Sequence, residues 1–165
     1  MNNKFARWAA IAALVTATAG CGFQLRGANS TSSLDALTVT AADPYGEFAR
    51  AFDVEMRQRN IEKGGANSWQ LIILEQEMDN NVLAVSDTNN AATYEVELEV
   101  RFQALNPQGD VAIEPNTLRL VRNYEANNNR RLAMERETQL LRNELYRDMA
   151  RRLIERVNMI ALQQR

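Results

Sequence analysis

Residues 94–103 read YEVELEVRFQ, and this stretch decides the fold class. Its apolar residues alternate strictly with polar ones, and they are Tyr94, Val96, Leu98, Val100 and Phe102. Side chains of a β-strand point alternately to two faces, so the pattern predicts a strand with one buried face and one wet face. A slip of one residue would expose the apolar face to water, and the pattern therefore fixes the register as well.

The residues that follow predict the partner of this strand. Pro107-Gln108-Gly109 has the composition of a turn, and residues 117–124 alternate again with Leu118 and Leu120 on the inner face. Two alternating segments joined by a short turn are typical of an antiparallel hairpin.

Three extended segments precede the long strand. Residues 37–41 alternate as a short half-buried strand, residues 69–75 form a compact apolar strand, and residues 80–86 are a weaker extended stretch. Residues 28–33 are small and polar, which is typical of a flexible tether. The folded domain is therefore expected to cover residues 34–165.

The first helix is predicted between the first two strands. Asp43 and Pro44 form a helix-start signal, with an acidic cap and a proline at the first helical position. The helix should stop by Gly64. Its apolar stripe, which we assign to the core, consists of Tyr45, Phe48, Phe52 and Met56. Its polar residues, expected to face water, are Glu47, Arg50, Glu55, Arg57 and Arg59.

The second helix is predicted from Arg130 to the end of the chain. Apolar residues recur there at helical spacing, and they are Leu141, Leu145, Met149, Leu153, Val157 and Ile160. Helices of this kind bury their apolar stripe against a sheet. We therefore predict an α+β fold, with a mixed, mostly antiparallel four-stranded sheet and two helices packed on one face.

Composition removes the usual tools of most enzyme classes. The chain has no histidine and a single cysteine, so the commonest general base, the commonest metal ligands and an internal disulfide are absent. No glycine-rich phosphate loop or paired-cysteine motif occurs. Charge is uneven, because residues 21–118 hold 6 bases and 15 acids, whereas residues 119–165 hold 11 arginines and 6 acids. A solvated helix face or an anionic partner can explain such an arginine-rich segment.

The N-terminal segment has the layout of a lipoprotein signal peptide. Within residues 1–20, Lys4 and Arg7 precede a short apolar run, and small residues lead directly to Cys21. A thiol at that position can accept a diacylglyceryl group, which anchors a protein to a membrane. We expect cleavage before Cys21 and lipidation there, with residues 21–33 as the lipidated tether. Thr18 stands where such sites usually carry a large aliphatic residue.

The sequence from the lipidation site resembles a known family. The heptapeptide Cys21-Gly22-Phe23-Gln24-Leu25-Arg26-Gly27 resembles the start of LptE lipoproteins. The likeness continues at matching spacing through Asp43-Pro44, the strand of residues 93–105, Arg122-Asn123-Tyr124 and Leu132-Ala133. It covers nearly the whole mature chain.

The resemblance implies a function in lipopolysaccharide assembly at the outer membrane. It implies a sheet-and-two-helix domain that plugs the LptD β-barrel, binds lipopolysaccharide and is not an enzyme. The implied location is the periplasmic side of the outer membrane, and no cofactor, metal or nucleic acid is expected. Some relatives carry a basic residue directly after the Leu-Ala pair, where this chain has Met134. The lipopolysaccharide-binding candidates are therefore the arginines around it, Arg130, Arg131 and Arg136.

Two alternative functions compete with this interpretation. An envelope hydrolase would use paired carboxylates, and the candidates are Glu135 with Glu137 and Glu144 with Asp148. A linker lipoprotein would join membrane and periplasmic proteins without binding lipopolysaccharide.

The wet face of the long strand raises a separate question. Glu95, Glu97 and Glu99 lie in one row and repel one another unless a basic group or water lies opposite. Either a polar barrel lumen or an arginine of a neighbouring strand, such as Arg119, can supply that opposite group.

Overall fold

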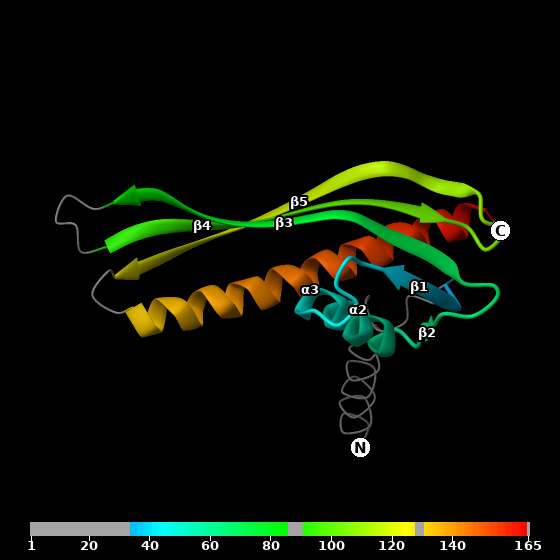
Figure 1. Cartoon of the computed structure of the whole chain (residues 1–165), viewed down its shortest axis with the longest axis horizontal. Coiled ribbons are helices and arrows are strands. Elements are labelled where there is room, and N and C mark those ends of the chain that lie inside the picture. Colours follow the sequence, from blue (N-terminus) through cyan, green and yellow to red (C-terminus); the bar gives the residue numbers. More distant parts are fainter. Residues whose placement is uncertain (1–33, 86–90, 128–130, 165) are drawn as a thin grey trace, which may run out of the picture. The chain divides into compact units, whose positions relative to one another are not determined.

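The computed structural model describes residues 34–85, 91–127 and 131–164 (Figure 1). The signal peptide, Cys21 and the tether predicted from the sequence lie outside these residues. The described strands are β1 (Ala36–Thr40), β2 (Glu62–Lys63), β3 (Trp69–Val85), β4 (Ala91–Leu105) and β5 (Val111–Asn127). The helices are α2 (Glu47–Gln58) and α3 (Arg131–Gln163).

The strands form one mixed sheet in the order β2-β1-β3-β4-β5. β1 runs parallel to both of its neighbours, whereas β3, β4 and β5 are antiparallel. The predicted fold class and hairpin are therefore confirmed. The sheet has five strands where four were predicted, because β2 contains only two residues, Glu62 and Lys63, and is too short to show alternation.

β3 is longer than the sequence indicated. As far as Val85, the two extended segments predicted at residues 69–75 and 80–86 belong to a single strand of 17 residues, with irregularities of register at Leu74 and Leu83. Its first part is largely buried, whereas nearly all of its second part is exposed. A strand that is wet on both faces has no hydrophobic alternation, so its continuity left no signal.

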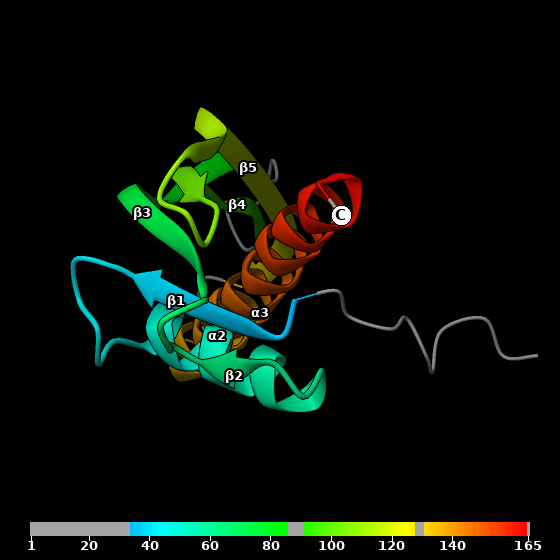
Figure 2. The same cartoon turned by 90° about the vertical axis from the view of Figure 1, so that its right-hand side faces the viewer.

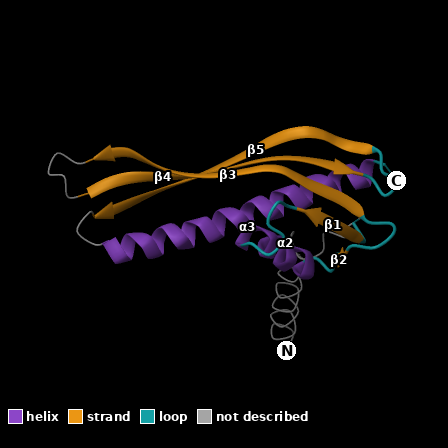
Figure 3. Ribbon diagram, in the orientation of Figure 1, coloured by secondary structure: helices purple, strands orange, loops and turns teal. Residues whose placement is uncertain are grey.

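Both helices pack on one face of the sheet, and α3 runs along the length of β3, β4 and β5 (Figures 1 and 3). The alternation of β4 buries Val96, Leu98, Val100 and Phe102 completely against this helix layer. α3 contributes the predicted stripe, in which Leu145, Met149, Leu153 and Val157 are completely buried and Leu141 and Ile160 are partly buried. Figure 2 shows α2 beside α3, on the side where β1 and β2 lie.

The predicted start of the first helix is wrong. The amide of Tyr45 donates to Oδ1 of Asp43 at 3.0 Å, so the side chain of Asp43 closes a turn instead of capping the helix. α2 begins at Glu47, after Gly46 as the N-cap residue. Tyr45 consequently lies outside the helix and is 85% exposed, although Phe48, Phe52 and Met56 are buried as predicted.

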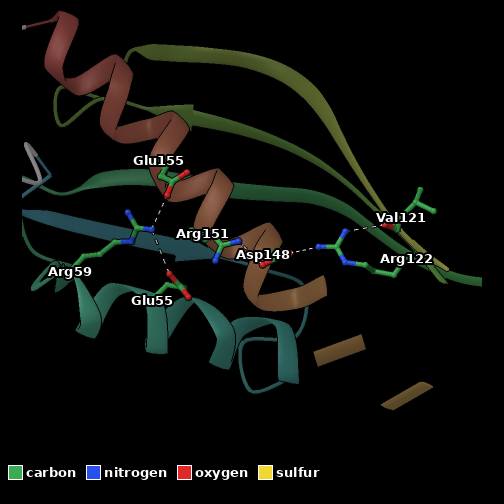
Figure 4. A network of polar contacts seen from close by, with 7 residues as sticks. All are labelled: Glu55, Arg59, Val121, Arg122, Asp148, Arg151 and Glu155. Carbon is green, nitrogen blue, oxygen red and sulfur yellow. Dashed lines mark hydrogen bonds and ion pairs between the residues drawn. The ribbon is translucent and has the colours of Figure 1, made fainter. Parts of the chain in front are cut away.

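The prediction that Glu55 faces water is also wrong. Glu55 is only 8% exposed because α3 packs over this part of α2. Nη2 of Arg59 lies 3.6 Å from Oε2 of Glu55 and 3.0 Å from Oε1 of Glu155 in α3. One guanidinium group therefore joins carboxylates of both helices (Figure 4).

Candidate interaction surface

The face of the sheet opposite the helices is strongly acidic. Register places the alternate residues of β3, β4 and β5 together on this outer face. Its acidic residues are Glu75, Glu77, Asp79, Glu95, Glu97, Glu99 and Glu125. Arg101 and Arg119 are the basic residues that these three strands place there.

Arg119 neutralises the centre of the acidic row. Its guanidinium forms a two-pronged ion pair with the carboxylate of Glu97 on the neighbouring strand. The hydrogen bond and charge of Glu97, together with the charges of Glu95 and Glu99, raise the pKa of Arg119 above its ordinary value. The interpretation that an arginine across the ladder offsets the glutamate row is thus confirmed on the β5 side.

On the β3 side, like charges lie directly opposite one another. Glu77 pairs in register with Glu99, and Asp79 pairs with Glu97. Among the described residues, the side chains of Glu77 and Asp79 have no ion pair or hydrogen bond. Directly opposed like charges destabilise a sheet. This part of the outer face therefore favours a cationic group beside β3.

The start of β4 and the end of β5 lie side by side, and the end of β5 contacts the first turns of α3. The rings of Tyr94 and Tyr124 stack at a centroid distance of 5.1 Å. The hydroxyl of Tyr124 lies 2.8 Å from that of Thr138 in α3, and either can donate. Several large apolar side chains near this end are more than half exposed, and they are Val82, Leu83, Val85, Leu132 and Leu140. Such a concentration of exposed apolar residues is typical of an interaction site.

A polar network joins α3 to the sheet further along (Figure 4). Asp148 accepts from Arg122 of β5 at 2.5 Å and from Arg151 at 2.6 Å. Arg122 also donates to the carbonyl oxygen of Val121 at 3.0 Å. Asp148, one of the hydrolase candidates, is therefore engaged by two guanidinium groups in a contact that joins α3 to β5.

The other acidic candidates show no catalytic arrangement. Glu135, Glu137 and Glu144 are exposed on α3. No cluster of three or more acidic, histidine or cysteine residues in residues 34–85, 91–127 and 131–164 could hold a metal ion. Neither α2 nor α3, the helices of the described ranges, has an apolar stretch long enough to cross a membrane.

Comparison with known families gives the decisive observation. Residues 34–157, which include every described strand and most of α3, match the family model LptE, described as Lipopolysaccharide-assembly. The chain belongs to the LptE family. The resemblance predicted from the sequence is therefore confirmed.

Individual LptE proteins are similar to this chain over most of its length. LPS-assembly lipoprotein LptE of Photorhabdus laumondii is 32% identical over 144 residues, which cover 85% of this chain and 78% of the relative. LPS-assembly lipoprotein LptE of Yersinia enterocolitica is 29% identical over 148 residues, covering 87% and 70%.

Solved lipoprotein structures share the fold. Rare lipoprotein B from Shewanella oneidensis superposes with a TM-score of 0.67 at 22% identity, covering 78% of this chain and 98% of that one. A minor lipoprotein from Acinetobacter baumannii gives a TM-score of 0.63 at 17% identity, covering 76% and 91%. At these identities the likeness extends to the fold alone.

The arginines proposed for lipopolysaccharide lie at the start of α3 in this LptE-family chain. Arg131 is the first residue of the helix, Arg136 is exposed on it, and Arg130 lies outside the described residues. Met134, which stands where some relatives carry a basic residue, is partly buried against the core. Sequence reasoning missed Arg142, whose buried Nε has no hydrogen-bond partner among the described residues, because one more arginine in an arginine-rich helix gives no distinct signal.

Proposed function

We propose that this chain is an outer-membrane lipoprotein that works with an LptD-type β-barrel to assemble lipopolysaccharide in the outer leaflet. Signal cleavage precedes Cys21, and acyl chains on that residue hold the domain at the periplasmic side of the outer membrane. The observation that carries the proposal is the LptE family match over residues 34–157. The lipidation site that precedes this domain in the sequence supports it.

Lipid attachment at Cys21 supplies the membrane affinity in this proposal. Each buried methylene of an acyl chain contributes about 0.8 kcal/mol, so a single chain binds marginally and two or more bind durably. The tether of residues 21–33 then lets the folded domain reach a partner in the same membrane.

The start of α3 supplies the contact with lipopolysaccharide. Arg130, Arg131 and Arg136 fall within the first turns of this helix or directly before it. Guanidinium groups bind phosphate in a bidentate manner, which suits the phosphorylated sugars of lipopolysaccharide. The exposed Leu132 and Leu140 lie in the same segment and give it an apolar surface beside the charges.

Affinity purification tests the barrel partner. The tagged full-length chain is extracted from envelopes in mild detergent, and co-purifying proteins are identified by mass spectrometry. A large outer-membrane β-barrel should co-purify in stoichiometric amount, and depletion of the chain should reduce lipopolysaccharide at the cell surface. Normal surface delivery in depleted cells would refute the proposal.

Titration with purified lipopolysaccharide tests the binding site. Replacing Arg130, Arg131 and Arg136 together by glutamine should weaken binding about tenfold or more, because each lost charged hydrogen bond is worth about 1.5–3 kcal/mol. The matched control replaces three exposed arginines elsewhere, Arg50, Arg57 and Arg152, and should leave the affinity within about twofold. Equal losses in the two triple variants would place the contact elsewhere.

A further inference from the structure

The edge of β3 is open over most of the strand. β1 pairs with β3 only as far as Thr40 opposite Ile72, and no other described strand lies on that side. From Leu74 to Val85 every residue is exposed except Met78, which is partly buried. Half of the backbone N–H and C=O groups of an edge strand have no partner in the sheet, which makes such an edge a template for a further strand.

The two edges of this part of the sheet differ in composition. The part of β5 that matches Leu74–Val85 in register runs from Thr117 to Ala126 and carries the charged Arg119, Arg122 and Glu125. Proline and charges are the features that keep an edge strand from pairing with other chains. β3 has neither from Asn80 to Val85, where the sequence is NNVLAV. Its exposed edge therefore lacks both features over these six residues, and the register irregularity at Leu83 is the one feature there that interrupts regular pairing.

Apolar side chains accompany the unprotected edge. Val82 is 56% exposed, and Leu83 and Val85 are each 51% exposed. Register with Tyr94 and Ala92 places Val82 and Val85 on the helix side of the sheet. An added strand would cover these side chains as well as the open hydrogen-bonding groups, which favours uncharged residues opposite residues 80–85.

The acidic residues of β3 indicate which side chains an added strand would carry along the rest of the edge. Glu77 and Asp79 face the like charges of Glu99 and Glu97, and Arg119 neutralises Glu97 only from the β5 side. The remaining position beside Glu77 and Asp79 is the one that a neighbouring strand would occupy. Directly opposed side chains have Cβ atoms about 4.5–5.5 Å apart, so lysine or arginine on that strand would offset both carboxylates.

We propose that β3 binds an extended segment of a partner protein as an additional strand along Leu74–Val85. The segment carries lysine or arginine opposite Glu77 and Asp79, and uncharged residues rich in valine or threonine opposite residues 80–85. The proposal rests on the proposed function only for the identity of the partner protein, which under that function is the LptD-type β-barrel. The chemistry of the segment follows from the edge itself.

Peptide binding to the full-length lipoprotein in detergent tests this edge. The probe is a fluorescein-labelled peptide of the length of Leu74–Val85, with lysine alternating with threonine in one half and valine alternating with threonine in the other. Two such peptides are used, one with the lysine half at its N-terminus and one with it at its C-terminus, so that both strand directions are tested. Fluorescence anisotropy should show saturable binding for one of them. Methylating alternate backbone nitrogens keeps the side chains but removes donors, and should weaken binding at least about tenfold.

Two variants of the chain locate the site. Leu83→Lys places a charge in the unprotected edge and should weaken peptide binding about tenfold or more. Asn123→Lys adds the same charge at an exposed position of β5 and should leave the affinity within about twofold. The double variant Glu77→Lys with Asp79→Lys should no longer bind the lysine peptide. It should instead bind a peptide in which glutamate replaces each lysine. Circular dichroism verifies that each variant is folded.

The remaining outcomes decide against the proposal. Equal binding of the methylated peptide, equal effects of Leu83→Lys and Asn123→Lys, or no reversal in the charge-swapped pair would overturn strand addition. A wild-type dimer that Leu83→Lys converts to monomer would mean that a second copy occupies the edge, which also overturns it. Failure of the barrel to co-purify, with peptide binding intact, would refute the proposed function but leave the edge as a strand-binding site.

Discussion

Asp148 is the residue at which α3 is tied most directly to the sheet. It accepts from Arg122 of β5 and from Arg151, and its side chain is only 20% exposed. Removing the carboxylate leaves two guanidinium groups without their partner at a partly covered site. We expect Asp148→Ala to lower the free energy of unfolding by about 1–2 kcal/mol, below the cost of a fully buried pair because Arg122 is 38% exposed. Urea unfolding followed by circular dichroism measures the change.

Asp53 provides the matched control for Asp148. It pairs with Lys63 at 2.8 Å, but the lysine side chain is 68% exposed. Exposed ion pairs contribute little, so Asp53→Ala should change the free energy of unfolding by less than about 0.5 kcal/mol. Equal effects of the two substitutions would show that the network of Asp148 is no more stabilising than a surface pair.

At the scale of elements, α3 is unevenly supported along its length. From Leu145 to Ala161 it buries a continuous stripe, whereas Leu132 is 74% and Leu140 59% exposed. Helices in water depend on tertiary packing for most of their stability. We expect amide hydrogen exchange to give opening free energies roughly 2 kcal/mol or more lower for residues 132–140 than for residues 145–160. Uniform protection along the helix would contradict this gradient.

The hydroxyl contact between Tyr124 and Thr138 connects that weaker segment of α3 to the sheet. Thr138→Val keeps the shape of the side chain but removes the hydroxyl that lies 2.8 Å from the hydroxyl of Tyr124. In Thr138→Val, protection of backbone amides from hydrogen exchange should fall further in residues 132–140 and stay unchanged in residues 145–160. Thr117→Val, at an exposed position of β5, is the control and should alter neither segment.

The elements that the sequence predicted well are those with one buried face. β4 and α3 each bury one side, so the alternation of Val96 to Phe102 and the helical spacing of Leu145 to Val157 reported burial directly. The second half of β3 is wet on both faces, and Asp43 uses its side chain to close a turn, so neither left a periodic signal. Local hydrogen bonding and exposure therefore account for these two errors, whereas the error at Glu55 comes from the packing of α3 over α2.

The candidate surface was predictable only where it depended on side-chain type. The glutamates of β4 and their partner Arg119 follow from alternation and a hairpin, both visible in the sequence. The open edge of β3 depends on the point at which β1 stops pairing, at Thr40 opposite Ile72. That point is a property of the three-dimensional arrangement, because residues 37–41 and 69–75 give no register for a parallel pair.

At the scale of the whole folded domain, one core connects both helices to the sheet. Buried residues of α2, α3 and every strand except β2 belong to a single cluster, with Leu153 completely enclosed in it. A domain with one continuous core unfolds cooperatively, so the loss of one central side chain should weaken all elements together. Trp69 in β3 and the helical signal of α3 report on separate parts of this core.

We expect Leu153→Ala to lower the free energy of unfolding by about 2–5 kcal/mol, because the substitution leaves a cavity among completely buried neighbours. Fluorescence of Trp69, in the chain that begins at Cys21 and so lacks Trp8, and far-ultraviolet circular dichroism should shift to the same lower urea midpoint. Leu140→Ala removes the same atoms at a position 59% exposed and should cost less than about 0.5 kcal/mol. Midpoints that separate in Leu153→Ala would show that α3 melts independently of the sheet, and the single core would then not hold the domain together.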